Sequence, residues 1–266
     1  MYDINIIQQK AKYCRAFEIS VFEQIKKGNI KIPVYLSAGQ EYIAATIGTY
    51  CSFLSSRIQI FAQHRCHSIY LSFGGDTELL IRELLGLPTG CANGMGGSAS
   101  IHFHNTSTSM YGHDGMMGSN IPIGVGACYA SKIPTIIFAG DAAAEEDYAL
   151  TSYGWAGTKN LPILFVIEDN NLSILTEKKI RRSWEIYKIA EAMNIESYNI
   201  TDNPIDIMGA CYGLFYKPKL LNINTVRKFW HSGAGIDGIE NKDELDNCEE
   251  ELEGINKIWK QVLETQ

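Results

Sequence analysis

The sequence predicts an α/β protein in which a parallel sheet is covered by helices on both faces, giving three layers. Short apolar runs rich in β-branched residues alternate along the 266 residues with longer segments of helical periodicity. The short runs are apolar almost throughout, as expected of strands buried on both faces of a parallel sheet. Ligands bind to such sheets at the carboxyl ends of the strands, so functional residues are expected in the loops that follow the strands.

The apolar runs predict the strands, and the segments of helical periodicity predict the helices. The β-branched apolar runs predict strands over 59–62, 135–139, 163–167 and 220–223. Segments in which apolar residues recur at helical spacing predict helices near 4–27, 40–54, 76–85, 121–131, 145–158, 184–193 and 204–216.

Composition excludes several classes of protein. The chain is 45% hydrophobic and 20% charged, which is unlike collagen, a coiled coil or a disordered chain. No apolar run approaches the roughly 20 residues of a membrane-spanning helix, and the first residues do not resemble a signal peptide. The seven cysteines are scattered with no CxxC pair, which indicates reduced thiols and a cytoplasmic location.

The negative charge is concentrated at one end of the chain. Residues 1–236 carry 20 acidic and 20 basic side chains, whereas residues 237–266 carry 10 and 3. We therefore predict one main domain over 1–236 and an acidic helical tail over 237–266 that packs on it or extends from it. A neutral body with an acidic tail argues against nucleic acid or a membrane surface as a partner.

Polar side chains follow two of the predicted strands. Asp141 follows the predicted strand 135–139 after Gly140, and Asn170 follows the predicted strand 163–167 after Glu168-Asp169. Neighbouring parallel strands would bring the two side chains together, and their oxygens are ligands that Mg²⁺ prefers. A helix-capping aspartate and an ordinary Asn-Asn turn are the alternative interpretation of the same residues.

Two glycine-rich segments, 89–98 and 111–122, can approach a ligand closely and offer backbone N–H groups. They match neither the dinucleotide fingerprint nor the Walker phosphate loop. Histidines cluster near Cys66, but their spacing fits no common zinc template.

Taken in order, these segments resemble the alpha subunit of the thiamine diphosphate-dependent 2-oxo acid dehydrogenases (pyruvate, branched-chain and acetoin types), in short and divergent form. The resemblance runs from about Arg15 to Ser232. It rests on Gly39-Gln40-Glu41, His64-Arg65-Cys66-His67, Glu83-Leu84-Leu85-Gly86, Gly94-Met95-Gly96-Gly97-Ser98, Gly115-Met116-Met117-Gly118, Gly140-Asp141 followed by Asn170, and Arg227 followed by His231-Ser232.

The resemblance implies a thiamine diphosphate-binding fold, specifically its diphosphate-binding domain, and a role for each matched residue. It implies that Mg²⁺ is bound by Asp141, Asn170 and the carbonyl of Leu172. The implied cofactor-binding residues are those three with His64, Arg65, Gly115, Met117, Ala142, Ala143, Arg227 and His231. His231 and His102 are the implied proton-transfer residues, His102 by a match that needs two extra residues.

The resemblance also implies partners. In this family a beta subunit supplies the glutamate that activates the cofactor, so an α₂β₂ assembly is expected, acting on a small 2-oxo acid with a lipoyl carrier as one acyl acceptor. The sequence departs from the family at Ala142, which replaces a glycine, and at Glu145, whose charge would lie close to a diphosphate unless the side chain points away.

These departures leave three functions open. The first is decarboxylation of a 2-oxo acid with transfer of the acyl unit to a lipoyl group. The second is a two-subunit transketolase-like or acyloin-forming transferase that joins the two-carbon unit to a carbonyl acceptor in a specialised biosynthetic pathway. The third is a scaffold subunit that has lost catalysis.

Overall fold

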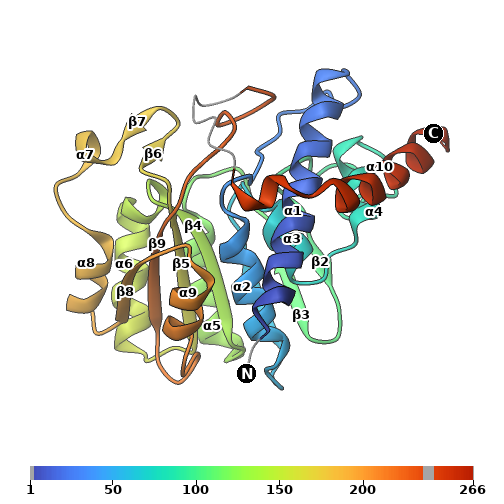
Figure 1. Ribbon diagram of the computed structural model, residues 1–266. Coiled ribbons are helices and arrows are strands. Elements are labelled where there is room, and N and C mark those ends of the chain that lie inside the picture. Colours follow the sequence, from blue (N-terminus) through green and yellow to red (C-terminus); the bar gives the residue numbers. More distant parts are fainter. Residues whose placement is uncertain (1–2, 236–242, 266) are drawn as a thin grey trace. The chain divides into compact units, whose positions relative to one another are not determined.

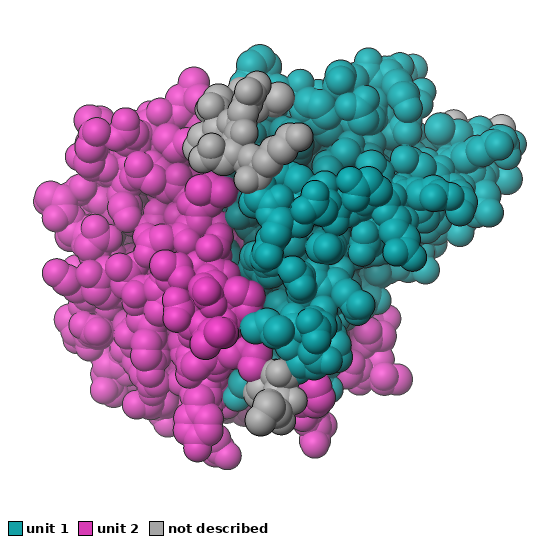
Figure 2. All heavy atoms as spheres, viewed as in Figure 1, with its two compact units in different colours: residues 1–52, 64–103, 227–266 teal, residues 53–63, 104–226 magenta. Residues whose placement is uncertain are grey.

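The computed structural model describes residues 3–235 and 243–265, and the chain divides into two compact units (Figures 1 and 2). Unit 1 consists of Met1–Ser52, His64–Phe103 and Arg227–Gln266, and unit 2 of Phe53–Gln63 and His104–Val226. Each unit is therefore built from segments that lie far apart in the sequence.

Unit 2 is built on a seven-stranded sheet with the order β2-β3-β1-β4-β5-β9-β8. The pairs from β3 across to β8 are all parallel. The strands are β1 (Ile58–Phe61), β2 (Phe103–His104), β3 (Thr108–Tyr111), β4 (Thr135–Gly140), β5 (Ile163–Asp169), β8 (Glu196–Thr201) and β9 (Lys219–Asn224). β1, β4, β5 and β9 confirm the four strands that the sequence predicts.

Both faces of this sheet are buried. Ile137 and Phe165 on one face pack with side chains of the helices α5, α6 and α8, and the alternate residues Ile136 and Leu164 on the other face are also fully buried. The helical elements of unit 2 are α5 (Asn120–Ser131), η1 (Ala143–Glu145), α6 (Asp147–Thr158), α7 (Lys178–Arg181), α8 (Ile186–Ala192) and α9 (Pro204–Ala210), with a small hairpin of β6 (Leu172–Ser173) and β7 (Thr176–Glu177). The predicted α/β class is confirmed.

Several elements of unit 2 differ from the sequence prediction, which also does not include the short elements β2, β6, β7 and α7. β3 lies in a run of serines and threonines that has no apolar pattern, and it is a strand because it pairs with β1. β8 is a polar edge strand that pairs with β9. The helix predicted over 204–216 ends at Ala210, and the chain beyond it turns through Gly213 at φ +70°.

Unit 1 is a group of helices around the long helix α1 (Ile4–Lys26). Its other elements are α2 (Glu41–Ser52), α3 (His67–Ser72), α4 (Thr77–Leu84), η2 (Glu244–Asp246) and α10 (Glu249–Glu264). α10 packs on α1 and α4 (Figure 1). Its Trp259 is 1% exposed and donates an indole hydrogen bond to Ser20 Oγ at 3.0 Å. The domain boundary predicted at 236 falls within residues 236–242, outside the described residues, and stays a prediction.

Substituting Ile255 in α10 tests whether the acidic helix depends on this packing. Ile255 is fully buried, so Ile255→Val removes one methylene from a packed contact. It should lower the free energy of unfolding by about 1 kcal/mol. The control Lys257→Ala, at a side chain 70% exposed, should change it by less than about 0.5 kcal/mol. Urea unfolding curves measure both, and equal midpoints for the two variants would contradict the packing.

Two further expectations from the sequence concern reduced cysteines and membrane-spanning helices. All seven cysteines are free thiols. Among the residues described, no helix combines the length and the apolar character needed to cross a membrane.

Candidate active site

Two acidic loops meet at the carboxyl edge of the sheet in unit 2. The register of β4 and β5 pairs Gly140 with Glu168, so that Asp141 and Asp169 follow at neighbouring strand positions. Asn170 comes one residue further along, and its side-chain oxygen accepts a hydrogen bond from Leu172 N at 3.0 Å. The two strand ends therefore bring the predicted Asp141 and Asn170 loops to one edge.

A basic segment over residues 178–182 neutralises these acids. Lys178 Nζ lies 2.6 Å from Asp169 Oδ2, and Arg181 pairs with Asp141. Burial, followed by the neighbouring charge of Asp169, raises the pKa of Asp141 above its usual value, and Arg181 opposes this rise. Four basic residues within five positions are visible in the sequence, but no local pattern indicates which acids they pair with, so no role is predicted for this segment.

Glu145 is held by the same basic segment. One of its oxygens pairs with Arg181, and the other lies 2.5 Å from Arg182 Nη1. Arg182 Nη1 also donates to the backbone oxygen of Asp141 at 2.7 Å. Because both carboxylate oxygens of Glu145 are engaged by arginines, its charge is compensated within unit 2.

The second glycine-rich segment lies against the Asp141 loop. Gly118 adopts φ +78°, and a Cβ there would lie 2.9 Å from the oxygen of Ala143. The hydroxyl of Tyr148 donates to the oxygen of Met117, and Gly115 adopts φ +99° with open space around it. Unit 2 thus gathers the predicted residues Gly115, Met117, Asp141, Ala142, Ala143, Asn170 and Leu172. Ala142 and Ala143 lie ahead of and within the short turn η1, and the following helix α6 begins only at Asp147.

Unit 1 gathers most of the other candidates. The rings of His64 and His231 lie 5.4 Å apart, and each contacts Tyr35, at 4.9 and 5.5 Å between ring centroids. Arg65 is 3% exposed and donates to the oxygens of Leu36 at 2.7 Å and His231 at 3.4 Å. These contacts bring His64, Arg65 and His231 into one cluster, and Arg227 is likewise 3% exposed.

His102 has a different setting in unit 1. It is half-buried four residues beyond the first glycine-rich segment, and its backbone lies beside Cys91. Its role as a proton-transfer residue stays a prediction.

A buried chain of side chains links four segments of unit 1. Glu18 contacts Ser37 Oγ at 2.5 Å and His67 Nδ1 at 3.2 Å. His67 Nε2 in turn lies 3.0 Å from Ser98 Oγ. All four side chains are at most 2% exposed, so this Glu-His-Ser arrangement is closed to substrates and holds the loops in place. Its four members come from four distant segments, and sequence spacing alone gives no signal for it.

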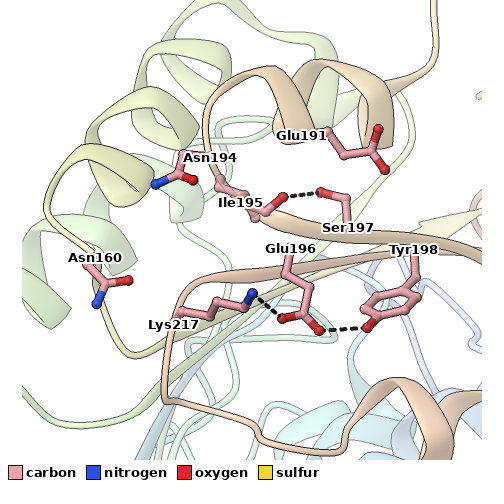
Figure 3. A pocket seen from close by; sticks show the side chains of 8 residues that line it. All are labelled: Asn160, Glu191, Asn194, Ile195, Glu196, Ser197, Tyr198 and Lys217. Atoms are coloured by element: carbon pink, nitrogen blue, oxygen red, sulfur yellow. Dashed lines mark hydrogen bonds and ion pairs between the residues drawn. The ribbon is translucent and has the colours of Figure 1, made fainter.

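A separate hollow of about 400 Å³ lies where β8 begins (Figure 3). Its lining residues are Asn160, Glu191, Asn194, Ile195, Glu196, Ser197, Tyr198 and Lys217. Because it opens at the amino end of a strand, it is not placed where α/β sheets bind their ligands. Glu196 is paired there with Lys217 at 2.8 Å and Lys219 at 2.9 Å, and it accepts from the hydroxyl of Tyr198 at 2.6 Å.

Glu196 gives a prediction for stability in acid. Partial burial favours its neutral form, but hydrogen bonds from Lys217, Tyr198 and Lys219 outweigh this and lower its pKa to about 2. An unfolded glutamate has a pKa of about 4.3. The stabilisation is therefore complete above pH 4.3 and is lost as the pH falls towards 2. An NMR titration of Glu196 should give this low midpoint, and Glu196→Gln should lose stability at pH 6 but not at pH 2.

Comparison with known proteins identifies the family. The model of the family described as "Dehydrogenase E1 component" matches residues 9–257. The pyruvate dehydrogenase E1 component subunit alpha of Rickettsia bellii is 26% identical over 265 residues, covering 94% of this chain and 79% of that protein. The alpha subunit of an acetoin:2,6-dichlorophenolindophenol oxidoreductase of Cupriavidus necator is 32% identical over 177 residues, covering 65% of this chain and 52% of that protein.

Solved structures agree on the fold. A transketolase from Campylobacter jejuni superposes with a TM-score of 0.63 at 17% identity, over 84% of this chain and 38% of that one. A second transketolase, from Leishmania mexicana, gives a TM-score of 0.61 at 13% identity, over 95% of this chain and 46% of that one. At these identities the likeness concerns the fold alone. The family match extends over nearly the whole sequence, and the chain belongs to the dehydrogenase E1 component family.

Proposed function

We propose that this chain is the alpha subunit of a thiamine diphosphate-dependent enzyme that decarboxylates a 2-oxo acid and transfers the resulting acyl unit. The observation that carries the proposal is the register of β4 and β5, which places the Asp141 and Asn170 loops at one sheet edge. The relatives are alpha subunits, so a beta subunit is the proposed partner, in an α₂β₂ assembly, and it would supply the activating glutamate. The location that we propose is cytoplasmic.

The donor set in unit 2 fits a magnesium diphosphate. Asp141 and Asn170 offer a carboxylate and a carboxamide oxygen, the carbonyl of Leu172 would be a third ligand, and Mg²⁺ prefers such ligands. Because Arg181 already contacts Asp141, a metal ion bound there would share or replace that contact. The compensated charge of Glu145 removes the main objection to an anion at this edge.

The roles of the remaining residues follow the family resemblance. In unit 2, the backbone at Gly115 and Met117 would hold the aminopyrimidine, and the amides of Ala142 and Ala143 would face phosphate oxygens. In unit 1, Arg65 and Arg227 would neutralise the diphosphate together with His64 and His231.

When bound, thiamine diphosphate supplies the carbanion chemistry of decarboxylation. The residues of this chain would bind and orient it, and His231 and His102 are the proposed proton-transfer residues because a neutral imidazole titrates near physiological pH.

The test uses the chain together with its beta subunit. Calorimetry should detect thiamine diphosphate binding in the presence of Mg²⁺ and none with EDTA, and the complex should release CO₂ from a 2-oxo acid. Formation of acyl-lipoamide supports transfer to a lipoyl carrier, whereas a new carbon–carbon bond with an aldehyde or ketone supports the transketolase-like or acyloin-forming alternative. Absence of metal-dependent binding would overturn the proposal and favour a scaffold subunit.

A further inference from the structure

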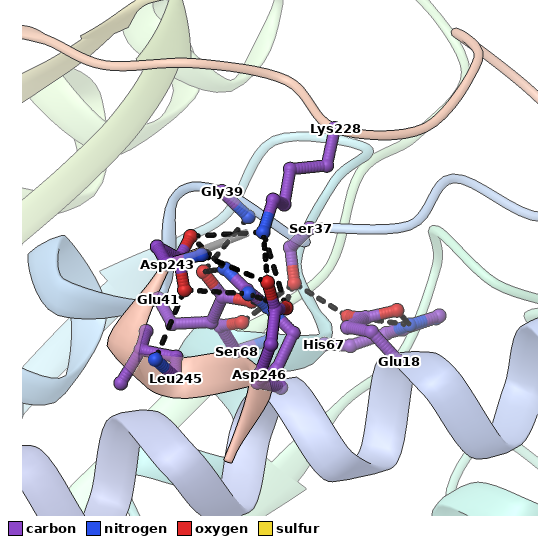
Figure 4. Close-up of polar contacts among 11 residues, drawn as sticks. Glu18, Ser37, Gly39, Glu41, His67, Ser68, Lys228, Asp243, Leu245 and Asp246 are labelled. Carbon is purple, nitrogen blue, oxygen red and sulfur yellow. Dashed lines mark hydrogen bonds and ion pairs between the residues drawn. The ribbon is translucent and has the colours of Figure 1, made fainter. Parts of the chain in front are cut away.

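The acidic turn that precedes α10 directs two carboxylates at one lysine (Figure 4). In this turn Asp243 accepts a hydrogen bond from Leu245 N, and Asp246 accepts one from Asp243 N, both at 2.9 Å. Lys228 Nζ lies 2.9 Å from Asp243 Oδ2 and 2.8 Å from Asp246 Oδ2. Asp243 and Asp246 also form the capping box of η2, in which each side chain accepts a hydrogen bond from the backbone of the other residue. These bonds fix the two carboxylates with respect to one another, so that Lys228 is held in a preformed clamp.

A buried arginine anchors this clamp to the core of unit 1. Arg15 of α1 is 1% exposed, and its Nη1 lies 2.9 Å from Asp243 and 2.5 Å from Asp246. Glu41 of α2 holds the other side of the same guanidinium, with distances of 2.5 and 3.0 Å. Two cations thus face three carboxylates, and the ammonium group of Lys228 is fully engaged within this network.

Lys228 lies in the segment that carries two of the proposed diphosphate-binding residues, Arg227 and His231. Segment 227–233 runs along residues 34–38: Lys228 N donates to Ala38 O at 3.0 Å, and Gly233 N donates to Val34 O at 2.8 Å. Phe229 stacks on Phe22 with ring centroids 4.6 Å apart. The side chain of Lys228 ties this segment to the acidic turn.

We propose that Asp243 and Asp246 are positioning residues for cofactor binding, because their clamp on Lys228 fixes the segment from which Arg227 and His231 present their side chains. The inference rests on the proposed function. Ordering a flexible segment when the ligand arrives consumes binding free energy, and a segment that is already held avoids this loss. The acidic turn therefore acts on affinity for the diphosphate through Lys228, and neither aspartate contacts the ligand.

The test compares two double variants that remove the same number of charges from the C-terminal segment. Asp243→Asn with Asp246→Asn opens the clamp and keeps the side-chain shapes. Glu249→Gln with Glu250→Gln removes two exposed charges from the first turn of α10. In complex with the beta subunit, the first pair should raise the Kd for magnesium thiamine diphosphate by about 10- to 100-fold, and the second pair by less than about twofold.

Three further measurements separate positioning from general stability. Lys228→Gln opens the clamp from its other side, so it should raise the Kd by a similar factor and add little when combined with the aspartate pair. Magnesium pyrophosphate, used alone as a probe, should lose affinity by the same factor as the whole cofactor, because the clamp acts on the diphosphate end. Asp243→Glu with Asp246→Glu keeps both negative charges, so its Kd should lie between the Kd of the wild type and the Kd of the asparagine pair.

The outcomes distinguish this inference from the proposed function. If the wild-type complex does not bind magnesium thiamine diphosphate, the proposed function fails. If the wild type binds but the aspartate pair or Lys228→Gln binds as tightly as the control pair, the positioning role is wrong and the proposed function stands. Additive losses from Lys228→Gln and the aspartate pair would also overturn the clamp.

Discussion

Replacing Asp141 by alanine is expected to weaken the magnesium-dependent binding of thiamine diphosphate by about 100-fold or more, since loss of outer-shell partners alone costs 10- to 100-fold. Asp141 is 1% exposed at the end of β4, and it is the charged member of the proposed ligand set. In the variant Arg181 keeps its second partner, Glu145, so a positive charge remains where the cation would bind. Calorimetry of the complex with its beta subunit measures the loss.

The control for this variant is Asp206→Asn. Asp206 is an exposed carboxylate in the first turn of α9, where it accepts a hydrogen bond from Thr201 at 2.8 Å. It should leave the Kd within about twofold. Thermal unfolding of both variants checks that each is folded, and a folded Asp141→Ala protein that binds the cofactor as tightly as wild type would refute the proposed metal ligand.

Replacing Glu83 by glutamine should destabilise unit 1 by about 3–5 kcal/mol. The carboxylate of Glu83 is fully buried and accepts backbone hydrogen bonds from four residues of the first glycine-rich segment. These donors are Ala92 at 2.7 Å, Gly94 at 2.9 Å, Gly96 at 2.7 Å and Gly97 at 3.2 Å. Glutamine keeps the volume, but its NH₂ group faces N–H donors, so two hydrogen bonds and the charge are lost.

Glu78 on the same helix provides the matched control. Its side chain is 48% exposed and pairs with Arg82 at 2.7 Å, a surface interaction worth about 0.3–0.5 kcal/mol. Urea unfolding should therefore shift strongly for Glu83→Gln and hardly at all for Glu78→Gln. Similar midpoints for the two variants would show that the glycine-rich segment does not depend on the Glu83 carboxylate.

Glu83 also shows that sequence motifs do not reveal the contacts between them. In the sequence, Glu83 and the glycine-rich segment form two separate motifs, and the structure shows that Glu83 organises the glycine-rich segment. At Gly90 a Cβ would lie 2.6 Å from the backbone of Glu83, so that glycine permits the close approach. The pattern of glycines is visible in the sequence, but the single acceptor that holds their N–H groups is a long-range contact.

The sequence by itself determined the strands β1, β4, β5 and β9, most of the helices, and the placement of Asp141 and Asn170 after successive strands of the chain. These features are local, because periodicity and turn chemistry act within a few residues. Only the tertiary structure decided that β3 and β8 are strands, that residues 178–182 neutralise Asp141, Glu145 and Asp169, and that Asp243 and Asp246 hold Lys228. Each of these depends on a partner brought near by the fold, and no local preference encodes the partner of a charge or of an edge strand.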